Sequence, residues 1–420
     1  MESGKVTSDC AVDVRIKTDY ANCRAVNSRR IDVRAMMTFV FKAYNKREET
    51  LLCNAEGAGI QTVTEENTAA SLCGMSERAF SLSEVIEIKS EKPPVSQIIN
   101  ATACAVADEI KIINNKALIK GNCNVKIYYI GDDSLSVESV EHSMPISQII
   151  EAEGLCEGCR PSIRLNISSC ETVPKADSSG NMCLIDLNVR ISAFTVGLEE
   201  KDVSLICDAY STEYAAENKH KNIELLSFND SFDNTFTNKV VLESIGVSVD
   251  CVMAVWGSDI SYSFNSKDGK CCINGTYQAN ILYKDTENQT GIIRKPVDFD
   301  FSVRMHENAE RIQCFGSVQI VSCSCAVTAD SRLELKTELC ASGIILSCGM
   351  KKYVSNIILS SDDSIKNENC ALTIYFCDKN ETLWDIARKY NTTVDAIKTE
   401  NEIEGDFVSD NSMLLIPSNG

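Results

Sequence analysis

The chain repeats itself at a spacing of 154 residues, and this repeat limits the possible folds more than any other feature. The stretch NKALIKGNCNVKIYY, residues 115–129, aligns with GKCCINGTYQANILY, residues 269–283, so that Gly121 falls on Gly275. The same spacing aligns two further pairs of segments: 52–55 with 206–209, and 31–33 with 185–187. The period is far longer than that of a solenoid repeat, so it indicates a duplicated domain.

Each repeat has the pattern of β-strands. Residues 182–196 (MCLIDLNVRISAFTV) alternate between the two faces of a strand, and residues 31–44 and 333–346 look like their counterparts in the neighbouring repeats. A glycine inside the strand at Gly121 predicts a bend or a bulge there. Turn-forming segments such as PKADSSGN separate the strands. The sequence therefore predicts a mainly β fold of tandem antiparallel β-sandwich-like modules, followed by a small C-terminal βααβ domain.

A chain of 420 residues is too long for one ordinary domain. The repeat predicts a series of regions: a partial β-module over 1–75, complete β-modules over 78–212 and 225–358, a polar linker over 359–369, and a further domain over 370–418. We expect the two complete modules to share one strand order. The linker predicts that the last domain moves independently of the β-modules.

The strand at residues 31–44 matches the second half of a module, so the partial module lacks its first half. Either the sequence is a fragment or has a misassigned start, or the half-module is genuine. In both cases half a sandwich leaves an open edge and an exposed apolar face. We expect this part to pair with a neighbouring module or to be poorly ordered.

The β-modules resemble the SPOCS domain of spore-forming Firmicutes. The resemblance rests on the strand that holds a glycine and ends in tyrosine, at Gly121 and Gly275. It also rests on the late alternating strand and on two short segments that follow the glycine strands, HSMPIS (142–147) and DFDFS (298–302).

The C-terminal region has a helical pattern that contrasts with the rest of the chain. Thr382 is placed to cap a helix, and Asp385 is placed to complete a capping box. An apolar helix face follows at Leu383, Ile386, Ala387 and Tyr390. Thr393 is placed to cap a second helix, and the segments LTIYF (372–376) and MLLIP (413–417) are typical of strands. The pattern predicts a small βααβ module.

This region resembles a LysM domain, because ETLWDIARKYNTTVDAIKTEN follows the family pattern DTLWxIAxxYxTTVxxLxxxN. LysM domains hold N-acetylglucosamine polymers in a shallow groove between the loop before the first helix and the loop after the second. The resemblance implies a groove formed by Asn380, Glu381, Thr382, Leu383, Asn401, Glu402 and Ile403.

The sequence departs from the LysM pattern at the groove. The usual Gly-Asp is replaced by Asn380-Glu381, and the usual glycine before the last strand is replaced within SDNSM, residues 409–413. A glycine there would allow close approach of the backbone to a ligand. Trp384 stands where packing on the helices is expected rather than stacking on a sugar. We therefore favour a protein partner over a glycan for this groove.

The 21 cysteines are expected to be free thiols that act as small buried hydrophobes, since the N-terminal MESGKVTSDCAVDVRIK has no secretory pattern. The segment CEGC, Cys156 to Cys159, has the spacing of a metal-ligand pair, but the sequence shows no second pair. The three histidines also form no ligand pair. We expect no metal and no cofactor.

Tandem SPOCS modules before a LysM domain resemble the SipL-type spore-envelope morphogenetic proteins of clostridia. The resemblance implies a non-enzymatic scaffold in the mother-cell cytoplasm, at the forespore surface where the spore coat assembles. Its implied partner is the coat morphogenetic ATPase or another coat protein. The alternative is a protein that binds peptidoglycan glycan strands of the cortex or cell wall.

Three other classes of function are disfavoured by the sequence. The formal net charge of −19 argues against nucleic acid. The chain has no glycine-rich phosphate loop, H-E-x-x-H or G-x-S-x-G motif, so we expect no enzyme and no catalytic residue. No stretch of eighteen consecutive apolar residues is present, so we expect no transmembrane segment.

Overall fold

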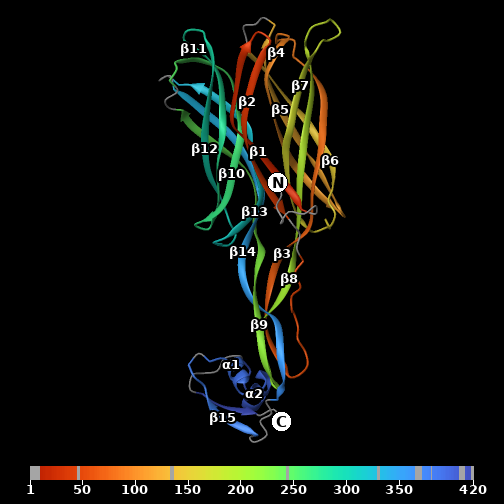
Figure 1. Cartoon of the computed structure of the whole chain (residues 1–420), viewed down its shortest axis with the longest axis vertical. Coiled ribbons are helices and arrows are strands. Elements are labelled where there is room, and N and C mark those ends of the chain that lie inside the picture. The colour runs from red at the N-terminus through yellow and green to blue at the C-terminus, as the bar shows by residue number, and fades with distance from the viewer. Residues whose placement is uncertain are drawn as a thin grey trace. The chain divides into compact units, whose positions relative to one another are not determined.

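The computed structural model describes residues 10–44, 48–132, 137–242, 246–328, 332–364, 371–379, 381–405 and 412–417. The chain divides into two compact units. The first comprises residues 1–46, 70–200 and 226–348, and the second comprises 47–69, 201–225 and 349–420. Antiparallel sheets dominate the described residues, and the two helices are both short and close to the C-terminus (Figure 1). The predicted mainly β fold is confirmed.

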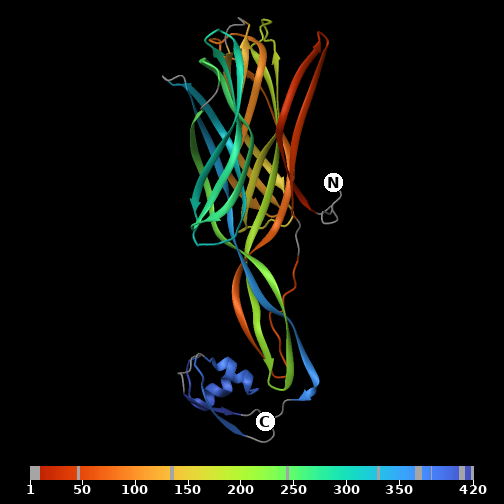
Figure 2. The ribbon, with the colours of Figure 1, turned by 60° about the vertical axis from the view of Figure 1, so that its left-hand side comes forward.

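The two complete β-modules have the same strand order. The first is built from β3 (Ile60–Glu87), β4 (Val95–Ile113), β5 (Lys116–Gly131), β6 (Val137–Glu151), β7 (Arg160–Lys175) and β8 (Leu184–Ser211). The second is built from β9 (Tyr214–Leu242), β10 (Val249–Lys267), β11 (Lys270–Asp285), β12 (Thr290–Arg304), β13 (Ile312–Val327) and β14 (Leu333–Ser364). The sheets β4-β5-β6 and β3-β8-β7 of the first module correspond to β10-β11-β12 and β9-β14-β13 of the second. The expected common strand order is therefore confirmed. Figure 2 shows the long strands of both modules from a second side.

Each module encloses its own hydrophobic core between its two sheets. In the first module Ile119 and Ile127 of β5 share a buried cluster with Leu187 of β8. In the second module Ile273 of β11 and Leu339 of β14 do the same. Alternate residues of these strands point inward, as the sequence pattern predicts for a half-buried strand. The strands β3 and β9 each extend across a domain boundary expected from the sequence, and those boundaries stay predictions.

The glycine of the repeated strand allows the backbone of the neighbouring strand to come close. The register of β4 against β5 shifts between Ala107 and Glu109, directly opposite Gly121. A Cβ atom on Gly121 would overlap the carbonyl oxygen of Val106 in the partner strand. Gly275 has the same relation to Ser261 of β10. The irregularity therefore lies in the strand that faces the glycine, which is a finer placement than the sequence allows.

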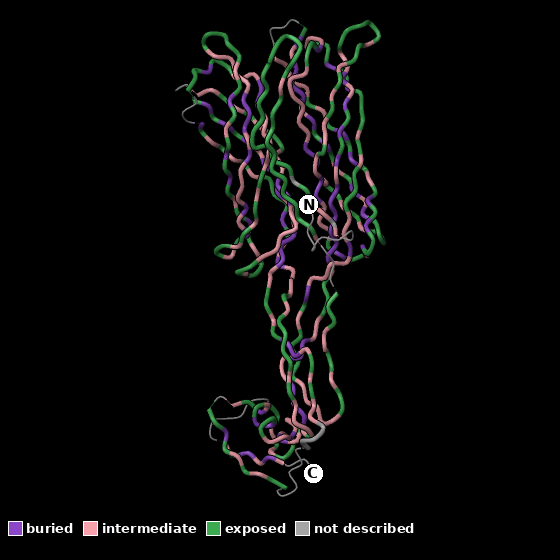
Figure 3. Tube along the Cα trace, viewed as in Figure 1, coloured by how far each residue is buried: buried purple, intermediate pink, exposed green. Residues whose placement is uncertain are grey.

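The N-terminal half-module is a hairpin of β1 (Ala11–Asn27) and β2 (Arg30–Tyr44) that forms a two-stranded sheet of its own. Most of its described side chains are exposed, including many large apolar ones (Figure 3). The predicted exposed apolar face is thus confirmed. The hairpin joins no neighbouring sheet in the described part of the chain. Residues 60–75 of the predicted partial module are the first part of β3, however, and β3 pairs with β8, so the expected pairing with a neighbouring module is found there. The hairpin itself contacts the second module, where the Thr18 N–H donates to Asp259 Oδ1 at 2.9 Å.

In the second unit, equivalent segments of all three repeats meet in a strand bundle, which we define as residues 48–69, 201–225 and 349–364. Its buried centre joins Leu52, Ile206 and Val354. The first two stand 154 residues apart, as in the sequence repeat, and the second and third stand 148 apart. The half-module therefore contributes at an equivalent position, but its residues 48–59 form no strand, whereas the complete modules contribute parts of β8, β9 and β14.

The end of β14 changes one boundary seen in the sequence. The strand continues to Ser364, so the first residues of the predicted linker, 359–364, are strand rather than linker. Residues 365–370 lie outside the described residues. Neither helix of the described chain is long and apolar enough to cross a membrane.

Candidate functional site

The C-terminal domain is the predicted βααβ module. It consists of β15 (Leu372–Phe376), α1 (Leu383–Lys389), α2 (Val394–Asn401) and β16 (Met413–Pro417), and the two strands pair antiparallel. Thr382 caps α1 in a capping box: its hydroxyl accepts from the Asp385 N–H at 3.2 Å, and its own N–H donates to the Asp385 carboxylate at 3.1 Å. The Thr393 hydroxyl caps α2 by accepting from the Ala396 N–H at 3.1 Å. Both predicted caps are confirmed.

One face of the β15–β16 sheet and the inner faces of the helices form the core of this domain. Its buried side chains include Leu383, Ile386, Ile397, Leu414 and Ile416. Leu383 was expected beside the groove, but only 1% of it is exposed. Its side chain therefore belongs to the core, and only its backbone can border a groove.

On one side of the predicted groove, Glu381 is held by contacts within the domain. Its carboxylate accepts hydrogen bonds from the Tyr375 hydroxyl at 2.7 Å and from the Asp378 N–H at 3.2 Å. The first of these bonds raises the pKa of Tyr375. Lys389 donates to the same hydroxyl at 3.2 Å. Thr382 is exposed but committed to its cap, and Asn380 lies outside the described residues.

On the other side of the predicted groove, Asn401 joins the end of α2 to β16. Its Nδ2 donates to the carbonyl oxygens of Ile397 and Leu415, at 2.8 and 2.6 Å, and its Oδ1 accepts from the Leu415 N–H at 2.7 Å. Glu402 is exposed and ends the helix in the left-handed conformation, with φ of 54°. Ile403 packs partly on the domain core. Asn401 is thus a structural residue with no spare polar atom.

The outer face of the β15–β16 sheet, opposite the helices, is apolar and exposed. Ile374 and Phe376 are 61% and 62% exposed, and Met413, directly opposite Phe376, is 55% exposed. Leu372 and Leu415 extend the same face, since Leu415 lies opposite Ile374 and Leu372 stands two residues from it. We call these five residues the outer sheet face. The sequence carried a signal for it, because LTIYF and MLLIP have apolar residues at nearly every position although helices cover only one face of the sheet.

The helices of this domain are docked onto the end of β8. Trp384 meets the Tyr210 ring edge to face, with centroids 4.7 Å apart, and its Nε1 donates to Asp208 at 2.9 Å. Arg388 donates to the same carboxylate oxygen at 2.6 Å. The buried Tyr210 hydroxyl donates to the Thr392 carbonyl at 2.7 Å. Trp384 therefore packs within the protein, on Tyr210 of β8 as well as on the core of its own domain. The independent movement of the domain stays a prediction, and this contact disfavours it.

Comparison with known families agrees with both resemblances. Residues 94–174 match the family described as SipL, SPOCS domain, and residues 378–417 match the LysM domain. The chain therefore combines a SipL-type SPOCS domain with a C-terminal LysM domain. Comparison with curated proteins and with solved structures gave no match. The SPOCS match covers β4 to β7 of the first module, and the shared strand order relates the second module to it.

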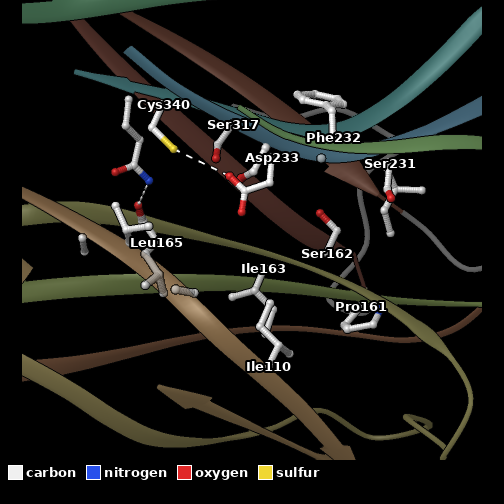
Figure 4. Close-up of a pocket in the computed structure, with 17 residues that line it drawn as sticks. Ile110, Pro161, Ser162, Ile163, Leu165, Ser231, Phe232, Asp233, Ser317 and Cys340 are labelled. Carbon is white, nitrogen blue, oxygen red and sulfur yellow. Dashed lines mark hydrogen bonds between the residues drawn. The ribbon is translucent and has the colours of Figure 1, made fainter. Parts of the chain in front are cut away.

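A cleft of about 280 Å³ lies between the two complete modules in the first unit (Figure 4). Ile110 and Ile163 line it from the first module, and Phe232, Asp233 and Cys340 line it from the second. The Cys340 thiol points toward the Asp233 carboxylate at 4.0 Å. Burial, together with this carboxylate, raises the pKa of Cys340, which is the opposite of what activates a thiol nucleophile. The Cys340 thiol is therefore not activated as a nucleophile in this cleft.

Proposed function

We propose that this chain is a non-enzymatic scaffold of the spore coat or envelope, and that its LysM domain docks on a coat protein at the forespore surface. The observation that carries the proposal is the outer sheet face. Four exposed apolar side chains and the half-buried Leu415 on one face favour an apolar protein surface as partner, because exposed patches of this kind mark interaction sites. The coat morphogenetic ATPase is the proposed partner, as the SipL-type resemblance implies.

The residues of the predicted groove support a protein partner over a glycan. Sugar recognition needs polar groups that point at the ligand and an aromatic ring that is free to stack on it. The polar atoms of Glu381 and Asn401 form hydrogen bonds within the domain, and Trp384 is packed on Tyr210. Thr382, Glu402 and Ile403 remain as the accessible part of the groove.

Binding of peptidoglycan glycan strands is the second candidate function. It is favoured by the match of residues 378–417 to the LysM domain and by the exposed end of α2 at Glu402. The two functions predict different sensitive surfaces, since a glycan would use the groove and a coat protein would use the outer sheet face.

Binding of the full-length chain to the coat morphogenetic ATPase tests the proposal, with sedimentation on purified peptidoglycan measured beside it. We expect the Ile374→Asp/Phe376→Asp double variant to weaken protein binding at least about tenfold, because each change places a charge at an apolar contact. Glu400→Ala, an exposed change on α2, serves as the control and is expected to bind normally. A chain that sediments with peptidoglycan and ignores the ATPase would replace the scaffold with the glycan anchor.

Two further variants separate folding from binding. Ile386 is fully buried, so Ile386→Lys is expected to unfold the LysM domain and to abolish every interaction. Ile403→Ser is expected to leave the domain folded. A fluorescent fusion in sporulating cells should form a ring around the forespore, and diffuse fluorescence throughout sporulation would contradict the proposed location.

A further inference from the structure

Three cysteines from distant parts of the first module meet in one cluster. Cys73 lies on β3, and Cys156 and Cys159 lie in the connection between β6 and β7. Their Sγ atoms all lie within 4.8 Å of one another. The spacing of Cys156 and Cys159 was visible in the sequence, but Cys73 is 83 residues upstream and only the fold brings it to them.

Glycines let the backbone close around this cluster. A Cβ atom on Gly154 of the connection would overlap the Cys73 carbonyl oxygen, and one on Gly74 would come within 2.6 Å of the Glu153 carbonyl oxygen. A Cβ atom on Gly197 of β8 would come within 2.9 Å of Cys73 Sγ and 3.3 Å of Cys159 Sγ. The thiols thus occupy a space that any side chain at position 197 would fill.

The second module shows that the fold does not need these thiols. Ser227 of β9 stands where β3 has Cys73, at the 154-residue spacing. Ile345 of β14 stands where β8 has Gly197, at the 148-residue spacing of the buried residues. The connection between β12 and β13, residues 305–311, contains no cysteine. The cluster is therefore an addition to the first module rather than a part of the shared core.

We propose that Cys73, Cys156 and Cys159 bind one Zn²⁺ ion as thiolates, with the carboxylate of Glu199 as the fourth ligand. Tetrahedral zinc with Zn–S bonds of about 2.3 Å places its sulfur ligands about 3.8 Å apart, which the observed cluster accommodates. Glu199 Oε2 already lies 3.8 Å from Cys156 Sγ. Thiolates are the ligands that select zinc over calcium or magnesium.

Binding is balanced by the release of protons. Each of the three thiols loses its proton to solvent when its sulfur coordinates the ion, and no oxidation takes place. Zinc affinity should therefore increase as the pH rises.

The ion would fasten three segments of the first module to one another: β3, the β6–β7 connection and the part of β8 that carries Gly197 and Glu199. A four-ligand site that is closed by protein side chains has a structural role. This inference stands apart from the proposed docking function, because it concerns the SPOCS module and not the LysM domain.

Metal analysis of the full-length chain tests the site. The protein is kept under a non-coordinating reductant, loaded with Zn²⁺ and washed with a weak chelator. We expect one zinc per chain, and we expect Co²⁺ to give the thiolate charge-transfer and visible bands of a tetrahedral site. Cys73→Ser, Cys156→Ser and Cys159→Ser should each lose the bound metal. Glu199→Gln should weaken binding about tenfold, since it removes an anionic ligand.

Cys325→Ser is the matched control, because Cys325 is a half-buried thiol of the second module that lies outside the cluster. It should keep one zinc per chain. Circular dichroism of each variant checks its fold, and Cys156→Ser, the half-buried change in a connection, decides the question if Cys159→Ser fails to fold. Less than stoichiometric zinc in the native chain would overturn the proposal. So would zinc retained by the cluster variants, copper or iron found in place of zinc, or a disulfide within the cluster in protein alkylated at lysis.

Discussion

The strands β2 and β8 have matching sequences and opposite surroundings. Ile31 and Val33 of β2 are 64% and 70% exposed, whereas Ile185 and Leu187, at the equivalent positions of β8, are fully buried. β8 is the central strand of its sheet, between β3 and β7, and is covered by the β4-β5-β6 sheet. The described part of β2 pairs with β1 alone. The alternating pattern therefore specifies a strand, but the opposing sheet decides whether its apolar face is buried.

The hairpin has few sources of stability besides its own ladder of hydrogen bonds. An isolated two-stranded hairpin is marginal in water. At its end Tyr44 packs on Phe194 and Phe315, with ring centroids 5.5 and 5.8 Å apart. Tyr44, Leu198 and Leu346 are equivalent positions of the three repeats, and they share one apolar cluster. The half-module is thus fixed at the end where the repeats converge, and along the rest of its length most of its described side chains are exposed.

The same substitution at equivalent positions of β8 and β2 tests whether their surroundings differ as the structure indicates. Ile185→Ala should cost about 2–5 kcal/mol, because it removes a buried side chain and leaves a cavity. Ile31→Ala, which is 154 residues away in sequence, should change the free energy of unfolding by no more than about 0.5 kcal/mol. Chemical denaturation measures the free energy of unfolding of each variant, and hydrogen exchange reports the local stability of β2 and β8. Equal costs would show that β2 is covered in solution.

The sequence predicted local features well because neighbouring residues produce them. The caps at Thr382 and Thr393 and the strand of residues 372–376 depend on spacing within a few residues. The repeat predicted the common strand order for a similar reason, since one pattern folded twice gives one topology. The groove was assigned by resemblance and not from the residues themselves. One residue assigned to it, Leu383, has its side chain buried in the domain core.

Contacts between distant segments were missed, because alternation says which residues face inward but not which segments meet. Cys73 and Cys156 are brought together by β3 and the β6–β7 connection, and no local pattern links them. The docking of Trp384 on Asp208 joins residues 176 positions apart. The polar linker in the sequence predicts freedom of the LysM domain, whereas Asp208 and Tyr210 of β8 make contacts with it that no local pattern showed.

A second test extends the comparison to Asp208 and its counterpart Asn54, which occupy the same repeat position. Asp208 accepts hydrogen bonds from Trp384 and Arg388, while the exposed Asn54 donates to nearby Glu56. Asp208→Ala should weaken docking of the LysM domain by about 1–3 kcal/mol, since it leaves two donors unpaired. Asn54→Ala should have no measurable effect.

The fluorescence of Trp384 reports this docking. The chain has two tryptophans, so a Trp256→Phe background isolates the signal. The Asp208→Ala variant should show a red-shifted emission as the indole enters water, and its LysM domain should be released faster by limited proteolysis. An unshifted emission would mean that the Tyr210 ring alone holds the domain.

The smallest expected effect concerns Tyr210, which stands where the first repeat has Glu56. Burial, and then the nearby Asp208 carboxylate, raises the pKa of Tyr210 from 10.0 to about 12. The docked state thus favours the protonated phenol, so its contribution is fully present below pH 10.0 and is lost as the pH rises toward 12. The emission of Trp384 in the Trp256→Phe background should shift to the red over this range.

Tyr210→Phe removes the titrating group and the bond to Thr392, so it should weaken docking by about 0.5–1.5 kcal/mol at neutral pH and flatten the alkaline transition. A transition that persists unchanged in Tyr210→Phe would assign it to another group and separate the LysM contact from the titration of this phenol.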